Sequence, residues 1–326
     1  MRKNRIQHSR LQLEIISRKK LDFVNPGFQN QNRARSYLLT QPYIIDKTPF
    51  HNKILEILED IRKDEINIFI PGIGNGSFIN YLIQNQNILS CKSINIVSAD
   101  ISNEMITSFF LNNGDLLQKY SNISIKIKIY SGANLVSKND PFYSLFEKEF
   151  DQYDIVLSSQ FEHYFPNSNQ SDLFNVLNDK ISNIFLKFEF RNYMKNFIAK
   201  NGYYITIDDF KFYDERENES NTIGWDKYVL KNFTDPQVIN NIRAIDSKVA
   251  KKIEELYNKS FSEKELLQKI QSRRAFRRQV CLEEIESFDD SIKIFSAIYG
   301  IENTNLFYHP IPDLQNFRMI IGKNAC

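Results

Sequence analysis

Three glycines stand at alternate positions in one short segment, and they are the residues with the clearest potential for chemistry. Only ten glycines occur in the 326 residues, so each is expected to meet a special backbone requirement. Gly72, Gly74 and Gly76 follow a β-favouring run and precede apolar residues at helical spacing. This pattern predicts a strand, a glycine turn and a helix, in which a ligand can lie against bare backbone.

An acidic residue ends the next predicted strand. The run 93–100 is β-favouring and closes on Asp100, where a carboxylate is placed to accept hydrogen bonds from ribose hydroxyls. The dinucleotide fingerprint requires a glycine where this chain has Ser77, which disfavours NAD. Taken together, the glycines and Asp100 favour an adenosine-bearing ligand over the alternative, a tight turn beside an ordinary strand-end acid.

A histidine follows another predicted strand, at 152–159. His163 lies where doubly wound sheets bind ligands, and its pKa range suits a general base near neutral pH. The alternative is a histidine that only hydrogen-bonds a loop. Glu162 adjoins it and is the candidate partner in a His–Glu dyad.

Aromatic side chains are candidates for an apolar wall around a flat organic substrate, with core packing as the alternative. The four substrate-contact candidates are Phe161, Tyr164, Tyr204 and Trp225.

These residues need a sheet to position them. Strands near 66–71, 93–100, 123–130, 152–159 and 203–209 alternate with helices, including one from Thr48 to Ile61 and one within 171–200. This βαβ series predicts a mostly parallel sheet. A helix near 291–299 and two strands near 303–309 and 316–321 predict an antiparallel hairpin that closes the sheet. We expect a helical N-terminal arm or lid at 1–47, a Rossmann-like core at 48–210 and 291–326, and a helical insertion over the substrate at 211–290.

Composition limits the classes of partner and compartment. A 42% hydrophobic fraction predicts a globular core, and a net charge of +2 gives no field that would draw the whole protein onto nucleic acid or membrane. Three dispersed cysteines suit neither a disulfide framework nor a metal site. No membrane-spanning apolar run occurs. We therefore expect a cytoplasmic protein with a small-molecule substrate, no metal, no membrane contact and no nucleic-acid partner, either as a monomer or as a homodimer.

Four segments resemble the class I S-adenosylmethionine-dependent methyltransferases, in the family's order and spacing. They are Ile70-Pro-Gly-Ile-Gly-Asn-Gly76, Ala99-Asp-Ile-Ser-Asn-Glu-Met105, Asp154-Ile-Val-Leu-Ser-Ser-Gln-Phe-Glu-His163 and Lys200-Asn-Gly-Tyr-Tyr-Ile-Thr-Ile-Asp-Asp209. The resemblance implies an α/β fold with a seven-strand sheet and S-adenosylmethionine as cofactor. The cofactor-binding residues that it implies are Gly72, Ile73, Gly74, Gly76, Asp100, Ile101, Met105, Ala133, Asn134 and Ser159.

The chain differs from the family pattern at two places. Ile70 stands where the family has an acid, and Ser131-Gly-Ala-Asn134 stands where it has Asp-Ala, although the Asn134 side-chain oxygen can accept the same hydrogen bond. The resemblance implies methyl transfer by in-line displacement to a small organic acceptor. The alternatives are an RNA or protein methyltransferase and a catalytically idle relative that binds an adenosine ligand.

Overall fold

The computed structural model describes most of the predicted core. The described residues are 2–8, 11–17, 47–74, 76–102, 105–106, 109, 123–133, 135, 140–149, 152–159, 161–162, 180–209, 262, 288–308 and 317–325. The predicted insertion at 211–290 therefore lies almost entirely outside the described residues, as does the segment 18–46. No helix within the described ranges is both long and apolar enough to cross a membrane.

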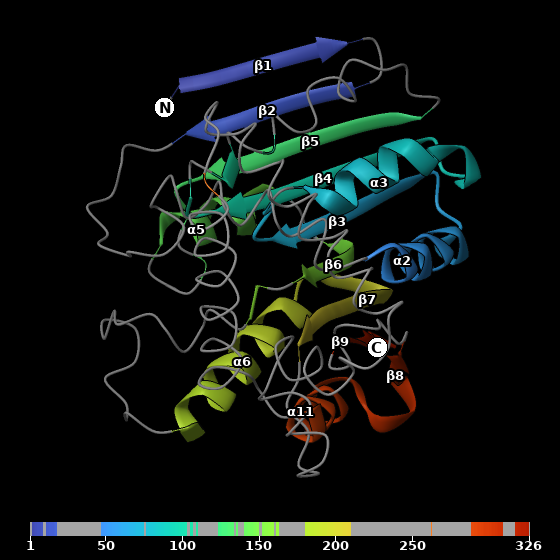
Figure 1. Ribbon diagram of the computed structural model, residues 1–326, viewed down its shortest axis with the longest axis vertical. Helices are drawn as coiled ribbons and strands as arrows, with labels where there is room; N and C mark the ends of the chain where they lie inside the picture. The colour runs from blue at the N-terminus through green and yellow to red at the C-terminus, as the bar shows by residue number, and fades with distance from the viewer. Residues whose placement is uncertain are drawn as a thin grey trace.

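One nine-stranded sheet forms the centre of the molecule, with strand order β1-β2-β5-β4-β3-β6-β7-β9-β8 (Figure 1). Its strands are β1 (Arg2–His8), β2 (Leu11–Ser17), β3 (Glu65–Pro71), β4 (Ser93–Asp100), β5 (Ser124–Ser131), β6 (Tyr153–Ser159), β7 (Ile198–Asp209), β8 (Thr304–Phe307) and β9 (Phe317–Lys323). The strands from β2 to β7 in this order pair in parallel, whereas β1, β8 and β9 pair antiparallel with their neighbours. This confirms the predicted α/β fold with its closing antiparallel hairpin, and it adds two strands to the predicted seven.

The two additional strands come from the segment for which a helical arm was predicted. β1 and β2 form an antiparallel hairpin, and β2 pairs in parallel with β5 from Leu11↔Ile125 to Ser17↔Ser131. Leu13 and Ile16 are buried in the two different core clusters, so β2 contributes to both faces of the sheet. The helical prediction is wrong here because β5 would otherwise present a row of unpaired backbone groups, which an apolar extended segment satisfies.

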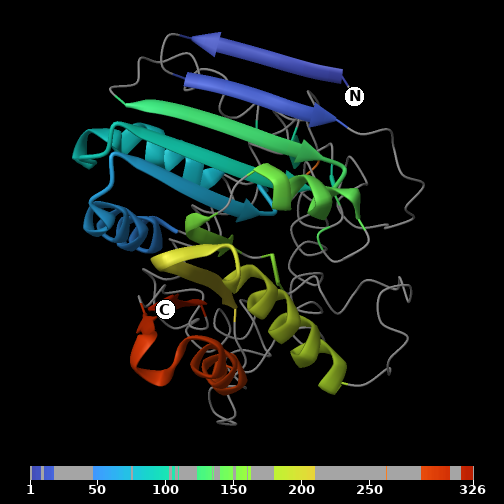
Figure 2. The same ribbon diagram turned by 180° about the vertical axis from the view of Figure 1, so that it is seen from behind.

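Helices cover both faces of the sheet (Figure 1; Figure 2, from behind). α2 (Thr48–Ile61) and α3 (Ser77–Asn85) bury Phe50, Ile54, Phe78 and Ile79 in one core cluster. α5 (Pro141–Glu149), α6 (Lys180–Lys195) and α11 (Phe288–Tyr299) bury Phe142, Phe146, Phe190, Met194 and Phe295 in the other. The sheet is therefore the middle layer of three.

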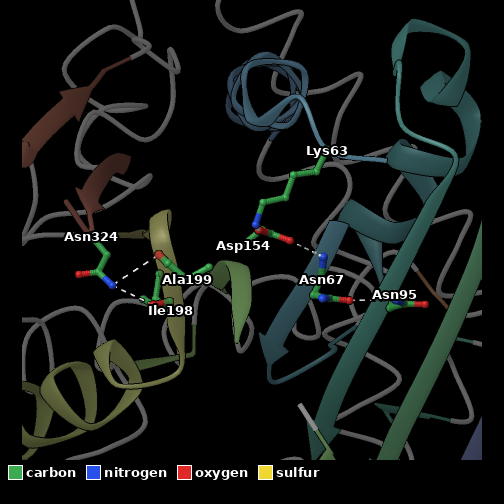
Figure 3. Close-up of polar contacts among 7 residues, drawn as sticks. All are labelled: Lys63, Asn67, Asn95, Asp154, Ile198, Ala199 and Asn324. Carbon is green, nitrogen blue, oxygen red and sulfur yellow. Dashed lines mark hydrogen bonds and ion pairs between the residues drawn. The ribbon is translucent and has the colours of Figure 1, made fainter. Parts of the chain in front are cut away.

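β7 begins at Ile198 instead of Tyr203, because the chain bulges where a turn was predicted. Asn201 adopts a positive φ of 64°, and Asn324 joins the last strand to this bulge (Figure 3). The Asn201 N–H donates to the Asn324 carbonyl at 2.6 Å, and the Asn324 side-chain amide donates to the Ile198 carbonyl at 2.8 Å. The bulge lets the strand start earlier, so the preceding helix ends at Lys195.

Asp154 joins the two central strands at the amino-terminal end of the sheet (Figure 3). Its carboxylate accepts a hydrogen bond from the Asn67 N–H at 2.8 Å. It also forms an ion pair with the Lys63 ammonium at 2.5 Å. Asn67 in turn accepts a hydrogen bond from the Asn95 side chain at 2.9 Å. This network supports the short β3–β6 pairing, whose opposite end carries the candidate site.

Replacing Asp154 by alanine is expected to lower the free energy of unfolding by about 1–3 kcal/mol, because the half-buried Asn67 N–H loses the buried carboxylate that accepts its hydrogen bond. Urea unfolding monitored by circular dichroism measures the change. Asp64→Ala is the matched control, since its ion pair with Lys92 is exposed on both sides and is worth about 1 kcal/mol or less. Equal losses in the two variants would show that Asp154 does not join the strands.

Candidate functional site

The strand order puts a topological switch point at the carboxyl end of β3. Within the sheet, β4 lies next to β3 on one side, and β6, which comes later in the chain, lies next to β3 on the other side. Open α/β sheets bind ligands outside the carboxyl ends of strands at such a switch point. The described residues that the resemblance assigns to the cofactor all follow β3, β4, β5 or β6 at this edge, or end one of these strands.

The glycine turn after β3 has the backbone that the sequence pattern requires. Gly72, Gly74 and Gly76 all have positive φ, at 71°, 54° and 68°, a region that other residues adopt only at a cost. The Gly72 N–H donates to the Ala99 carbonyl at 2.9 Å, which ties the turn to the end of β4. Among the described residues, a Cβ added at Gly74 would meet only the Met105 methyl group, at 3.8 Å. The backbone at Gly74 is therefore open to a ligand on that side.

Asp100 lies against this turn. One carboxylate oxygen accepts a hydrogen bond from the Gly74 N–H at 3.2 Å, and the other accepts one from the Ser102 N–H at 2.9 Å. The Ser102 hydroxyl then accepts a hydrogen bond from the Met105 N–H at 3.2 Å, the contact that an N-cap serine makes. Each Asp100 oxygen has a second lone pair, so the carboxylate can still accept hydrogen bonds from two hydroxyl groups.

Burial raises the pKa of Asp100 to about 6, although the Ser102 and Gly74 N–H groups oppose the rise by hydrogen-bonding the charged form. The ionised carboxylate is the better acceptor for hydroxyl donors. Ligand binding through Asp100 therefore favours loss of its proton.

Affinity for an adenosine ligand is expected to fall as the pH drops from about 7 to about 5, because protonation of Asp100, with its pKa of about 6, removes charged acceptor sites. Titrations with S-adenosylhomocysteine across this range measure the dependence. Asp100→Asn has no proton to gain, so it should bind weakly and without this step. If the affinity of Asp100→Asn still falls over this pH range, a group other than Asp100 causes the pH dependence.

At Gly72 and Gly76, close packing against a neighbouring ring also requires a residue without a side chain. A Cβ at Gly72 would lie 2.7 Å from the ring of Phe161, and one at Gly76 would lie 2.0 Å from the ring of Phe109. Phe161 thus lies directly on the glycine turn. Its predicted contact with a substrate stays a prediction. The close approach of Gly76 to Phe109 by itself requires a glycine, and a contact between Gly76 and the cofactor stays a prediction.

The other predicted cofactor residues lie at the same edge. Ile73, Met105 and Ala133 are buried, and Ile101 is half-buried. Ser159 ends β6, and its hydroxyl accepts a hydrogen bond from the Lys47 ammonium at 3.2 Å. Lys47 was not predicted as a site residue, because nothing in the local sequence indicates a contact with a strand so far along the chain.

Glu162 forms a buried polar cluster instead of facing open space. One carboxylate oxygen accepts hydrogen bonds from the Arg191 guanidinium at 2.6 and 2.7 Å, and the other accepts one from the Tyr204 hydroxyl at 2.7 Å. All three side chains are buried, and Arg191 stacks on the Phe295 ring at 4.9 Å. Burial and the neighbouring Glu162 raise the pKa of Tyr204. The cluster gives Glu162 and Tyr204 a structural task, and their predicted contacts with reactants remain predictions.

Several predicted site residues lie outside the described part of the chain: His163, Tyr164, Trp225 and Asn134. Within the described ranges, no group of three His, Cys, Asp or Glu residues is arranged to hold a metal ion.

No protein-family profile matches the sequence, and no curated protein is similar to it at a significant level. Solved structures resemble it at low identity. An O-methyltransferase family protein from Burkholderia thailandensis is 10% identical, with 91% of this chain and 61% of that chain covered and a TM-score of 0.47. The CurJ carbon methyltransferase is 12% identical, with 88% and 57% covered and a TM-score of 0.45.

A structure of PigF with SAH is 10% identical, with 93% of this chain and 63% of that chain covered and a TM-score of 0.46. The chain thus spans between 57% and 63% of the length of these three proteins.

Proposed function

We propose that the protein is an S-adenosylmethionine-dependent methyltransferase that acts on a small organic acceptor. The observation that carries the proposal is the contact between the Gly74 N–H and the Asp100 carboxylate at the switch point. It brings together an open backbone and a strand-end acid, which are the two parts that an adenosine ligand needs. The resemblance of the four sequence segments points to the same cofactor.

The residues present fit the cofactor. Gly74 leaves room for a ligand beside the backbone, and Asp100 has lone pairs for two ribose hydroxyls. When bound, the cofactor supplies a methyl group on a positively charged sulfur that acts as its own leaving group. The protein's part is to hold the ribose end at Asp100, align an acceptor with the methyl group and exclude water.

Phe161 is suited to exclude water, because its ring lies against Gly72 in the glycine turn. We propose that Phe161, Tyr164 and Trp225 contact an apolar acceptor. The net charge of +2 supports a small acceptor over an RNA, since it provides no general attraction to a polyanion.

We further propose that His163 accepts a proton from the acceptor. His163→Ala is then expected to lower the rate of methyl transfer and to leave the affinity for S-adenosylhomocysteine unchanged, since the base acts only on the acceptor. Turnover assays and binding titrations on the same preparation measure both quantities. Parallel losses of affinity and thermal stability would instead assign His163 a structural role.

Methyl transfer itself tests the proposed function. The purified protein is incubated with methyl-labelled S-adenosylmethionine and separate panels of phenols, carboxylic acids and amines. Label in an organic product, absent with Gly74→Val, would support the proposal, because the added side chain fills the open space at this turn. Tight cofactor binding with no labelled product from any panel would favour the idle relative.

A further inference from the structure

Phe161 belongs to a short segment that is fixed at both ends. On one side, Ser159 ends β6 and pairs with Ile207 in the sheet ladder. On the other side, Glu162 follows Phe161 directly, so that their Cα atoms are about 3.8 Å apart. Glu162 is almost wholly buried. The backbone at Phe161 therefore has little freedom to move while Glu162 stays in place.

Contacts from two other elements keep the Glu162 carboxylate in place. α6 supplies the Arg191 guanidinium at 2.6 and 2.7 Å, and β7 supplies the Tyr204 hydroxyl at 2.7 Å. Hydrogen bonds to an ionised group are stronger than neutral ones, and a buried charge that loses a partner is costly. These contacts therefore determine the path of the chain as it leaves β6.

The Phe161 ring carries this constraint to the glycine turn. A Cβ added at Gly72 would lie 2.7 Å from the ring, so the ring is in direct contact with the turn. The ring also packs on Phe190 of α6, with 6.0 Å between the ring centroids. Two residues beyond Gly72, the Gly74 N–H donates to the Asp100 carboxylate. A shift of Phe161 would therefore change the turn that holds this pair together.

We propose that Glu162 is a positioning residue for ligand binding. Its buried carboxylate holds the Phe161 ring against Gly72, and the ring keeps the glycine turn in the conformation that binds the adenosine ligand. The identity of the ligand rests on the proposed function, whereas the link from Glu162 to the turn does not. This role differs from that of a dyad partner for a histidine, because Glu162 acts here through Phe161.

Tyr204→Phe tests the link by a small change, since it removes one hydroxyl from the cluster and leaves the buried ion pair in place. The matched control is Tyr193→Phe on α6, because the Tyr193 hydroxyl donates to Glu147 at the surface, at 2.6 Å. Hydrogen exchange of the Gly72 amide, which is bonded to the end of β4, measures the stability of the turn without a ligand. Calorimetric titration measures the affinity for S-adenosylhomocysteine.

Tyr204→Phe is expected to speed exchange of the Gly72 amide and to weaken S-adenosylhomocysteine binding, each about three- to tenfold, the range for loss of one hydrogen bond. The Ser124 amide, which donates to the Lys92 carbonyl at the amino-terminal end of the sheet, should exchange at an unchanged rate. This comparison separates a local change from global unfolding. Tyr193→Phe should change neither the exchange rates nor the affinity.

A double-mutant cycle with Phe161→Ala tests whether the effect passes through the ring. In the Phe161→Ala background, Tyr204→Phe should change the exchange of the Gly72 amide and the affinity by less than about twofold, the limit for additive changes. The reason is that the ring that transmits the effect is already absent. Thermal midpoints well above the assay temperature would show that all four proteins are folded.

Equal effects of Tyr204→Phe with and without the Phe161 ring would overturn the inference, because the cluster would then act by another route. An unchanged affinity in Tyr204→Phe would overturn it as well, and in both cases the proposed function would stand. If the wild-type protein binds no S-adenosylhomocysteine, the proposed function fails. Faster exchange of the Gly72 amide in Tyr204→Phe would then still show that Glu162 holds the glycine turn.

Discussion

Replacing Arg191 by methionine is expected to lower the free energy of unfolding by about 3–5 kcal/mol, because it leaves the Glu162 carboxylate buried without its counter-ion. Two guanidinium nitrogens bind that carboxylate at 2.6 and 2.7 Å, and both side chains are almost wholly buried. Among the described residues, the neutral Tyr204 hydroxyl would remain as its donor. Urea unfolding near pH 7 measures the loss.

A double variant separates the unpaired charge from lost packing. Arg191→Met/Glu162→Gln removes both charges of this pair, and its glutamine oxygen can still accept a hydrogen bond from Tyr204. It is therefore expected to be more stable than Arg191→Met alone. Lys53→Met serves as a surface control, because Lys53 pairs with Glu56 at the surface. It should change the free energy of unfolding by about 0.5 kcal/mol or less. A double variant less stable than Arg191→Met would contradict the buried ion pair as the cause.

Replacing Gly76 by alanine is expected to lower the free energy of unfolding by about 2–5 kcal/mol, because it strains the backbone and overfills the core. Gly76 has a φ of 68°, and the new methyl group would lie 2.0 Å from the Phe109 ring. Phe109 is fully buried, so neither the ring nor the turn can move away cheaply. Thermal and urea unfolding measure the effect.

Gly74→Ala is the matched comparison on the same turn. Gly74 has a similar positive φ, but the nearest described contact of an added methyl group would be the Met105 methyl group at 3.8 Å. Gly74→Ala should therefore lower the free energy of unfolding only by the cost of the strained backbone, about 1–2 kcal/mol. Equal losses at the two positions would mean that the contact with Phe109 costs nothing.

Local patterns predicted the glycine turn and the acid beside it. Alternating glycines after an apolar β run predicted the turn, and all three glycines have the expected positive φ. The run that ends at Asp100 predicted β4 with its observed bounds. These features follow from neighbouring residues, because backbone conformation and strand alternation are local properties.

Contacts between distant segments could not be predicted in the same way. β2 is a strand because it pairs with β5, and its basic flanks gave no indication of that partner. The Glu162–Arg191 and Lys47–Ser159 contacts each join residues from different elements. Single charged residues have no periodicity, so only the completed fold brings these pairs together.

The proposed function depends on S-adenosylmethionine binding at Asp100 and the glycine turn. Calorimetric titration of the wild-type protein and Asp100→Ala with S-adenosylmethionine, S-adenosylhomocysteine and NAD measures this binding. We expect micromolar binding of the first two ligands and none of NAD. Asp100→Ala should lose about 1–3 kcal/mol of binding free energy for the two adenosyl ligands, because the charged hydrogen bonds are missing. Absence of binding by either adenosyl ligand, or an affinity unchanged by Asp100→Ala, would contradict it.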